Sequence, residues 1–571
     1  MSERDLERQE SSESFDEVEN AVVPWTTAEN DDDKKDPQGD YCEELEENEE
    51  EELQLEQILT TGSRSASRIR SRQSGASAHD DDEEITTALS MGRNKSLPPM
   101  PVVPKKSYVV EFDGAEDPMH PHNWPFAKKF RGCASLGLTT MCVAWGSAIY
   151  ATAVPEISMT YHVSQVVATL GMSLYIAGFA AGPVVWGSLS ELYGRKMPIL
   201  ISQFGFIAFT FGAATAKDIQ TIMLCRFFSG FIGSAPFSVV GGAFTDQFSN
   251  RYRGVSLICY LSTVFIGPML APVAGGFISA SYLGWRWTQY ITGIMGAAVF
   301  VLNIFCYEES YHPIVLVKKA RMLREQTGNW AIHAIAEERD IEIKEIVRRT
   351  VFRPIRILVT QPIVTLIAIY VSFVYGILYL CLEVYPIVFV EGYGFKGGIG
   401  ELPYIALFLG LLIGGLYLLC FEPRYRRLVQ KNGGRSVPEA RLDAMTVPSI
   451  CFPIGLFWVT WTGNYPEHIH WIVPTIGGGF IGFALMGIFL SSICYCVESY
   501  LTVAASVMAA NAFLRSAFAA AFPLFGKQMF HNMGTQWAGT LLGCVAAAMV
   551  PIPILFRLYA AKLKKTIKLT F

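Results

Sequence analysis

The chain has 571 residues, of which 51% are hydrophobic and 17% are charged, and its formal net charge is -6 at pH 7. This composition is too apolar for an ordinary soluble protein of this length, so we expect most of the chain to face lipid. The acidic balance comes from the first part of the chain and implies no nucleic-acid partner.

The first 107 residues are rich in Glu, Asp, Ser and Gln and poor in aromatic residues. Such a segment buries too little apolar surface to fold alone, so residues 1–107 are expected to form a disordered cytoplasmic tail. No apolar run near Met1 predicts a signal peptide. Ser67, Ser71 and Ser96 each follow an arginine by three residues, a spacing that suits basic-directed kinases, although a tail rich in Arg and Ser also produces this spacing by chance.

Twelve apolar runs are long enough for helices that cross a bilayer, which needs roughly 20 residues each. They lie near 132–154, 165–189, 198–216, 221–245, 255–280, 289–307, 360–388, 402–421, 446–464, 472–496, 500–525 and 536–557. Lys and Arg gather in the loops on one predicted side, whereas the loops on the other side hold Lys217, Arg286, Lys396 and Lys527. This bias predicts that both termini are cytoplasmic.

The predicted fold is an all-α membrane protein with twelve transmembrane helices in two six-helix bundles. The first bundle is expected at 108–307 and the second at 357–571, with a short basic tail after its last helix. A polar central cytoplasmic loop at 308–356 separates them. Two matching bundles around a central cavity are a common way to build a carrier with a site near the bilayer midplane.

The loop between the second and third predicted spans carries a pattern of glycines and charges. Its members are Gly187, Glu191, Gly194, Arg195 and Lys196. Glycine allows a tight turn and close helix approach, and Glu191 is near enough in sequence to pair with Arg195 or Lys196. We therefore expect a conformational latch, although a positive loop that only anchors topology is the alternative. The pattern resembles the corresponding loop of the major facilitator superfamily; the segment 421–427 of the second half is basic but lacks the glycine spacing.

Arg226 lies inside the fourth predicted span, where a charge costs about 3 kcal/mol or more. We expect it to face a cavity or a partner; snorkelling toward the outer surface near Lys217 is the alternative. Its spacing to the following glycines resembles a motif that is tied to proton transfer in related carriers.

The fifth span carries a row of glycines and prolines, namely Gly267, Pro268, Pro272, Gly275 and Gly276. Proline removes backbone hydrogen bonds that a lipid-facing helix cannot spare, so this span is expected to break and to lie between the bundles. The row resembles the antiporter signature of drug and proton exchangers in the superfamily, which implies exchange rather than symport. A generic kink is the alternative.

A transported proton needs a group that titrates, and none of the nine histidines lies in a predicted span. Glu383, which lies between Tyr379 and Tyr385 in the seventh span, is one candidate for proton and substrate coupling. Glu498, expected to open the eleventh span, is another. Solvation at the outer rim is the alternative for Glu383, and a helix N-terminal charge is the alternative for Glu498.

Arg515 and Asn511 are four residues apart in the eleventh span, so they share a helix face that we expect to line the cavity. Aromatic residues such as Tyr175 and Tyr379 could hold amines through cation–π contacts. The 12 cysteines lie mostly in apolar runs, so neither disulfides nor a metal site is expected.

Four blocks, at 375–379, 390–395, 401–404 and 510–518, resemble the fungal polyamine and drug exporters of the superfamily. The resemblance implies a proton antiporter that exports polyamines, diverse drugs or weak acids. It implies the plasma membrane rather than the vacuolar membrane. We also expect a monomer without cofactors, and the spacing of arginine and serine in the tail predicts kinases as its partners.

Two other functions stay open from the sequence. One is a facilitator or symporter for a small nutrient, which the row in the fifth span argues against. The other is a membrane sensor that does not transport and that signals through its tail and central loop. No nucleotide-binding loop or catalytic triad supports an ATP-driven pump or an enzyme.

Overall fold

The computed structural model describes residues 108–114, 117–248, 253–338, 352–433, 437–500 and 504–557. The predicted tail, with its candidate phosphorylation sites Ser67, Ser71 and Ser96, lies outside these residues. Within the described residues the regular structure is helical, apart from an isolated β-bridge between Val109 and His333.

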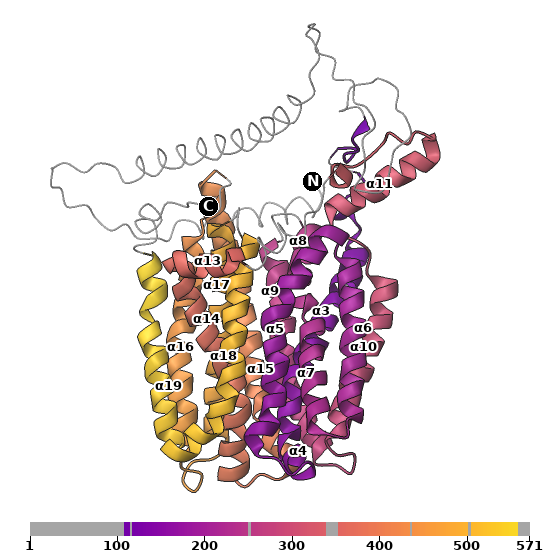
Figure 1. Cartoon of the computed structure of the whole chain (residues 1–571). Helices are drawn as coiled ribbons and strands as arrows, with labels where there is room; N and C mark the ends of the chain where they lie inside the picture. Colours follow the sequence, from indigo (N-terminus) through magenta and orange to yellow (C-terminus); the bar gives the residue numbers. More distant parts are fainter. Residues whose placement is uncertain are drawn as a thin grey trace, which may run out of the picture. The chain divides into compact units, whose positions relative to one another are not determined.

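Twelve helices of the described chain are long and apolar enough to cross a membrane, as the sequence predicted. The first six form the indigo-to-magenta part of Figure 1. They are α3 (Phe126–Ala148) with η4 (Ile149–Ala153) and α4 (Val154–Thr160), α5 (Gln165–Tyr193), α6 (Lys196–Thr215), α7 (Ile219–Gly233) with α8 (Ala235–Gln247), α9 (Arg253–Ser279) and α10 (Arg286–Cys306).

The other six form the orange-to-yellow part of Figure 1. They are α14 (Pro362–Tyr385) with the π-helix η7 (Pro386–Gly392), η8 (Gly397–Glu401) with α15 (Tyr404–Lys431), α16 (Glu439–Gly463), α17 (Ile472–Ser499), α18 (Ala504–Met533) and α19 (Thr535–Met549). Between the two halves lie α11 (His312–Thr327), η5 (Ile335–Glu338) and α13 (Arg353–Thr360).

The helix ends have local causes in the sequence. Asp218 precedes α7, and its side chain accepts a hydrogen bond of 2.8 Å from the backbone N–H of Thr221. Gly194 ends α5 with φ of 86°, and Gly328 ends α11 with φ of 66°, a backbone region that favours glycine. These caps satisfy or redirect backbone groups where each helix stops.

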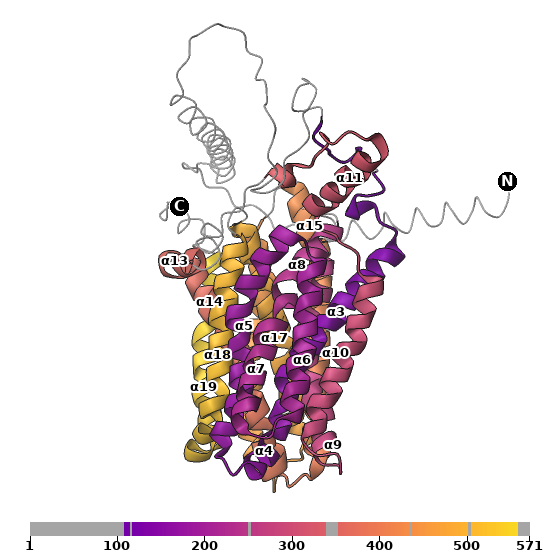
Figure 2. The same ribbon diagram turned by 45° about the vertical axis from the view of Figure 1, so that its right-hand side comes forward.

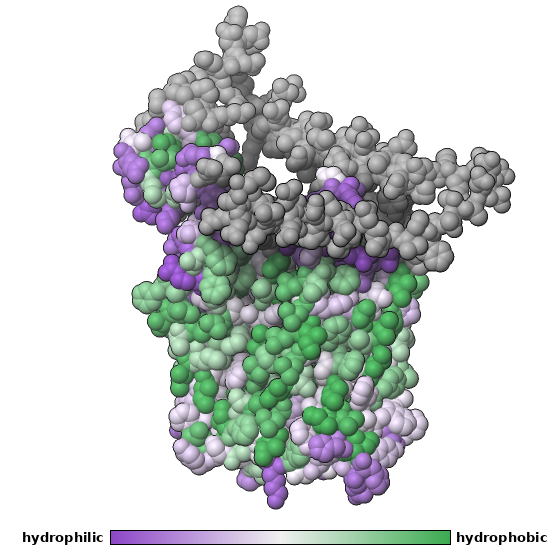
Figure 3. Space-filling model, turned by 180° about the vertical axis from the view of Figure 1, so that it is seen from behind, coloured by the Kyte–Doolittle hydropathy of each residue, from purple (hydrophilic) through white to green (hydrophobic). Residues whose placement is uncertain are grey.

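Large apolar side chains point outward along the spans. Phe204 is 64% exposed and Leu416 is 61% exposed. Figure 3 shows that hydrophobic side chains dominate a broad band on the face that it displays, with hydrophilic side chains gathered at its lower end. An apolar surface of this kind matches the hydrocarbon core of a bilayer.

Glycines let equivalent helices of the two halves approach closely. In the first half α5 packs on α7, and a Cβ at Gly230 would overlap the backbone of Tyr175. In the second half α15 packs on α17, and a Cβ at Gly482 would overlap the backbone of Leu407. Small residues at helix contacts are typical of membrane bundles, because apolar packing alone gives little preference over lipid.

The halves meet through two helix pairs. α5 of the first half packs against α18 of the second, and α9 packs against α15; the neighbouring α5 and α18 can be followed in Figures 1 and 2. We call the end of the bundle near α11 and α13 the inner end and the end near α4 the outer end, in keeping with the predicted orientation.

The segment before the first span is tied to α11 at the inner end. Lys319 of α11 forms ion pairs with Asp117 at 2.6 Å and with Asp113 at 2.8 Å. The backbone of residues 108–110 exchanges hydrogen bonds with His333, which follows α11. The start of the predicted central loop is therefore attached to the first half.

Candidate functional site

Arg226 is buried in the first half, with 2% of its surface exposed. Its Nη1 donates to the carbonyl oxygen of Gly146 at 2.8 Å, and its Nε donates to that of Gly171 at 3.3 Å. The guanidinium carbon lies 4.5 Å from the ring centroid of Tyr150 and 4.2 Å from that of Tyr175. The charge therefore faces carbonyl oxygens and aromatic faces, as a buried cation requires, and does not snorkel to the surface.

Arg515 is its counterpart in the second half. The residue is half-buried on α18, with its guanidinium carbon 4.8 Å from the ring centroid of Tyr375 and 5.0 Å from that of Phe489. Asn511, one turn earlier, is 3% exposed, and its Nδ2 has no hydrogen-bond partner among the described residues. Arg515 Nε also lacks such a partner there. These unused donors are available to a bound molecule.

A hydrogen bond and an aromatic contact join the first half, which contains Arg226, to the second half, which contains Arg515. The hydroxyls of Ser147 on α3 and Tyr379 on α14 lie 2.8 Å apart. Phe265 of α9 packs between the second-half rings, 6.1 Å from the ring centroid of Tyr375 and 4.8 Å from that of Phe489. We define the central cluster by six residues, Tyr150, Tyr175, Arg226, Tyr375, Tyr379 and Arg515.

The central cluster is positively charged and aromatic. Within the part of the chain that the structure describes, no carboxylate lies within ion-pairing distance of Arg226 or Arg515. The sequence analysis grouped Arg226, Arg515, Asn511, Tyr175 and Tyr379 with Glu383 and Glu498 as coupling residues. The first five lie near the contact between the halves, and their role in coupling stays a prediction. Such a cluster suits a flat or apolar molecule, and it attracts negative charge.

The candidate carboxylates lie elsewhere. Glu383 is half-buried on α14, farther toward the outer end than Tyr379. Glu498 lies near the end of α17, the tenth span, so the prediction that it opens the eleventh span is wrong. Its carboxylate accepts hydrogen bonds from Arg441 at 3.0 Å and from the hydroxyl of Tyr425 at 2.6 Å. It therefore belongs to an inner ion-pair network.

Sequence reasoning did not single out Glu401 as a site. This residue ends η8 with 8% of its surface exposed, and its Oε2 has no hydrogen-bond partner among the described residues. An acidic residue directly before the apolar run of the eighth span was the signal available, but helix starts often carry acids, so the position alone does not distinguish it.

The predicted latch is built differently from the expectation. Arg195 pairs with Asp246 of α8 at 3.1 Å, whereas Glu191 is exposed to solvent. The carboxylate of Glu309, after the sixth span, accepts hydrogen bonds of 2.9 Å from the backbone N–H groups of Arg195 and Lys196. The expected pairing with Glu191 is therefore replaced by acids from two other helix ends, which sequence spacing could not reveal.

The two predicted latch glycines differ in how tightly they are held. A Cβ at Gly194 would lie 2.5 Å from the carboxylate of Glu309, whereas the nearest atom to a Cβ at Gly187 would be 3.9 Å away. Only Gly194 is thus required by sterics and by its positive φ.

The second half has an equivalent network at its inner end. Arg441, near the start of α16, pairs with Glu422 of α15 at 2.8 Å and with Glu498 of α17 at 3.0 Å. In the first half the pair of Arg195 and Asp246 joins the third and fourth spans. In the second half the pair of Arg441 and Glu498 joins the ninth and tenth spans in the same way. The 421–427 segment lacks the glycines, but an arginine–carboxylate contact is retained.

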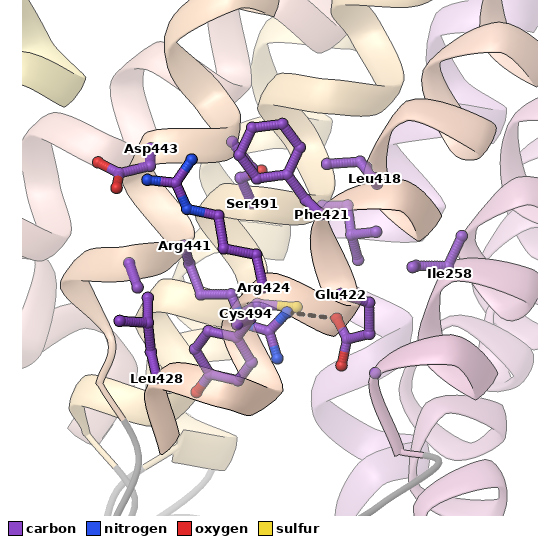
Figure 4. Close-up of a pocket in the computed structure, with 15 residues that line it drawn as sticks. Ile258, Leu418, Phe421, Glu422, Arg424, Leu428, Arg441, Asp443, Ser491 and Cys494 are labelled. Atoms are coloured by element: carbon purple, nitrogen blue, oxygen red, sulfur yellow. Dashed lines mark hydrogen bonds and ion pairs between the residues drawn. The ribbon is translucent and has the colours of Figure 1, made fainter. Parts of the chain in front are cut away.

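Figure 4 shows the Arg441 and Glu422 part of this network, which lines a pocket at the inner end. The side chains of Arg441 and Glu422 point toward one another and are joined by the ion pair, and Ile258 of α9 approaches from the first half. A Cβ at Gly254 of α9 would overlap the carboxylate of Glu422. The inner ends of the halves therefore also touch.

The row of glycines and prolines lies on α9, which contacts the second half, as expected. Pro268 and Pro272 are inside a continuous helix, so the prediction of a broken span is wrong. A Cβ at Gly267 would lie 2.7 Å from backbone atoms of α3, and one at Gly275 would lie 2.5 Å from Thr152. A Cβ at Gly276 would lie 2.5 Å from Cγ of Glu401. The row thus acts as a flat contact surface.

The family model of the Major Facilitator Superfamily matches residues 136–523. The Multidrug transporter TPO1_1 of Candida glabrata is 49% identical over 517 residues, covering 89% of this chain and 90% of that protein. The Major facilitator superfamily multidrug transporter FLU1 of Candida albicans is 48% identical over 482 residues, covering 84% of this chain and 79% of that protein. Among solved structures, the chain is similar to the xylose transporter XylE from E. coli in a partially occluded inward open conformation, with a TM-score of 0.51. The alignment covers 75% of this chain and 97% of that chain at 16% identity. This similarity bears on the fold alone.

Proposed function

The chain belongs to the major facilitator superfamily, and from this premise we propose that it is a proton-coupled antiporter that exports structurally diverse drugs from the cytosol by alternating access. The central cluster carries this proposal, because both halves contribute aromatic rings and a guanidinium group to it. Aromatic faces accept many flat or apolar molecules, since stacking needs no fixed hydrogen-bond pattern. The two yeast relatives, which are both named multidrug transporters, support the same substrate range.

The contacts of the cluster fit a movement of one half against the other. Arg226 is held by carbonyl oxygens of its own half, and Arg515 is held by rings of its own half. The hydrogen bond between Ser147 and Tyr379 crosses between the halves and has to break when they separate. Alternating access would thus open the cluster between two guanidinium groups that each stay with one half.

Glu383 is the proposed carrier of the proton. It lies on α14, the helix that also carries Tyr379 of the cluster, and its carboxylate is half-buried. A proton that enters from outside would neutralise this carboxylate, and its later release inside would drive export. The membrane potential supplies about 2.3 kcal/mol per charge per 100 mV for this step.

Polyamine export is a second candidate, favoured by the carboxylates of Glu383 and Glu401 in the outer part of the second half. The central cluster itself disfavours a polycation, because Arg226 and Arg515 would repel it. A polyamine would therefore be bound chiefly by the carboxylates.

We further propose that the protein acts as a monomer in the plasma membrane with cytoplasmic termini, and that kinases act on its tail.

Transport by purified protein in lipid vesicles tests the proposal. Vesicles loaded with a neutral azole, with spermidine or with an organic weak acid are given a pH gradient of either direction or none. Antiport predicts azole movement that follows the gradient and that stops when a protonophore collapses it. Equal movement without a gradient would indicate a facilitator, and no movement of any compound by folded protein would favour a sensor.

A further inference from the structure

The outer ends of the two halves touch through glycines. Gly276 of α9 lies in the first half, and η8 of the second half packs against this helix. A Cβ at Gly398 would lie 2.5 Å from the ring of Phe277, so the backbone of η8 rests directly on α9. We call the contact formed by Gly276, Gly397, Gly398 and Glu401 the outer gate.

Glu401 is the one member of the outer gate with an ionisable side chain. Its Cγ lies against Gly276, its surface is 8% exposed, and its Oε2 lacks a hydrogen-bond partner among the described residues. A buried ionised carboxylate without a donor or a cation is costly by several kcal/mol. The closed outer gate therefore favours the neutral acid.

Among the described residues, neither a hydrogen bond to Glu401 nor a cation paired with it is found. Glu383 on α14 is near enough for its charge to repel that of Glu401. Tyr404 of α15 donates its hydroxyl proton to the carbonyl oxygen of Cys381 at 2.8 Å, and Tyr385 of α14 packs on Tyr404 at 4.5 Å between ring centroids. From α9 the neighbour is backbone at Gly276.

Lys527 of α18 forms its ion pair with another carboxylate, at the outer rim of the bundle. Lys527, whose charge acts on Glu383, forms an ion pair of 3.6 Å with Glu391. His531, at the outer end of the same helix, lies 3.5 Å from that carboxylate. The prediction that no histidine lies in a span therefore fails for His531, since α18 extends to Met533.

We propose that Glu401 is a proton-binding site that controls the outer gate. When the gate is open, water reaches the carboxylate and it is ionised. A proton from the outer solution then binds to a carboxylate oxygen, and the neutral acid allows α9 and η8 to close on each other. The proposal rests on the alternating access of the proposed function, but it assigns the response to external pH to a residue distinct from Glu383.

Distances between the two halves at the outer end measure directly whether the outer gate is open or closed. Spin labels at Tyr282→Cys in the first half and Glu467→Cys in the second half sit on exposed outer positions of a cysteine-free background. In nanodiscs the wild-type background is expected to shift toward the longer distance as the pH rises from about 5 to about 8. Glu401→Gln, which cannot ionise, should lower the long-distance population at the higher pH by about threefold or more and remove the pH response.

Two further variants keep the test decisive. Glu401→Asp should retain a pH response, and Glu391→Gln, a change in the exposed carboxylate of the rim, should behave like the wild type. Melting temperatures show whether Glu401→Gln is folded. A pH response that survives in folded Glu401→Gln, or that is missing from the wild type, overturns the proposal.

The same variants separate this inference from the proposed function. A gate response that depends on Glu401, found together with drug movement that ignores the pH gradient, would retain the gate site and refute antiport. Gradient-driven drug movement with an unchanged gate response in Glu401→Gln would retain antiport and refute the gate site.

Discussion

The central cluster and the outer gate treat buried charge in opposite ways. In the cluster, Arg226 has its charge spread over two carbonyl oxygens and two aromatic faces. In the outer gate, Glu401 is also buried and has no donor at Oε2 within the described residues. A compensated charge is a permanent part of a binding site, whereas an uncompensated one can be removed by a proton. Under the proposals made above, substrate contact and proton control would therefore occupy different places in the chain.

Loss of the compensated charge is expected to have the largest effect. Arg226→Ala removes the buried charge together with its hydrogen bonds to the carbonyl oxygens of Gly146 and Gly171 and its contacts with the rings of Tyr150 and Tyr175, so efflux should fall by about thirtyfold or more. Arg226→Lys keeps the charge but not the planar fork and should recover only part of the activity. Azole efflux at equal surface abundance measures both, and normal efflux in Arg226→Ala would show that the cluster needs no fixed cation.

A side chain added to the outer gate is expected to have the next largest effect. Gly276→Val places methyl groups where Cγ of Glu401 lies, so the gate cannot close and efflux should fall by about tenfold. Gly187→Ala is the matched control, because its Cβ would have no neighbour closer than 3.9 Å. Equal transport by both variants would mean that the glycine contact does not close during the cycle.

Glu383 tests whether the carboxylates serve substrate as well as proton. Glu383→Gln keeps the size of the side chain but cannot ionise, so spermidine efflux should fall about fivefold more than azole efflux. Both compounds are measured with the same vesicles. An equal loss of efflux for both compounds would assign Glu383 to proton coupling alone. No loss for either compound would indicate that Glu383 is a solvated residue of the outer rim without a role in transport.

Asp117 shows what a carboxylate does when it has a cation, and its effect is expected to be the smallest. The hydrogen bond from Lys319, supported by the backbone N–H of Asp113, lowers the pKa of Asp117 to about 2. Because this pKa lies below the unfolded value of about 3.9, the carboxylate stabilises the fold above that pH and loses this effect as the pH falls toward 2. Asp117→Asn should lower the Tm by about 2 to 4 °C at neutral pH. The difference from wild type should narrow below about pH 4, and a constant difference would assign the effect to packing.

Features that depend on a local run of sequence were predictable. Runs of roughly 20 apolar residues set the twelve spans, and the high cost of a charge in lipid identified Arg226 as a residue that needs partners. The twelve-span fold therefore followed largely from composition and the lengths of the apolar runs, whereas Tyr150 and Tyr375 of the central cluster were not named as site residues.

Features that depend on distant partners were not predictable in the same way. Arg195 has an acid four residues away in sequence, yet it pairs with Asp246 from the end of another span. The prolines of α9 are held inside a continuous helix that packs against both halves, which local propensity cannot anticipate. Glu401 became visible only when the structure brought Gly276 against it.

The ion pair between Asp117 and Lys319 also bears on how the protein is made. Asp117 precedes the first span and Lys319 follows the sixth, so a ribosome completes all six spans of the first half before this contact can form. Domains generally fold as units in the order of synthesis. Closure of the pair therefore marks the moment at which the first half is complete, before the last helices of the second half have been translated.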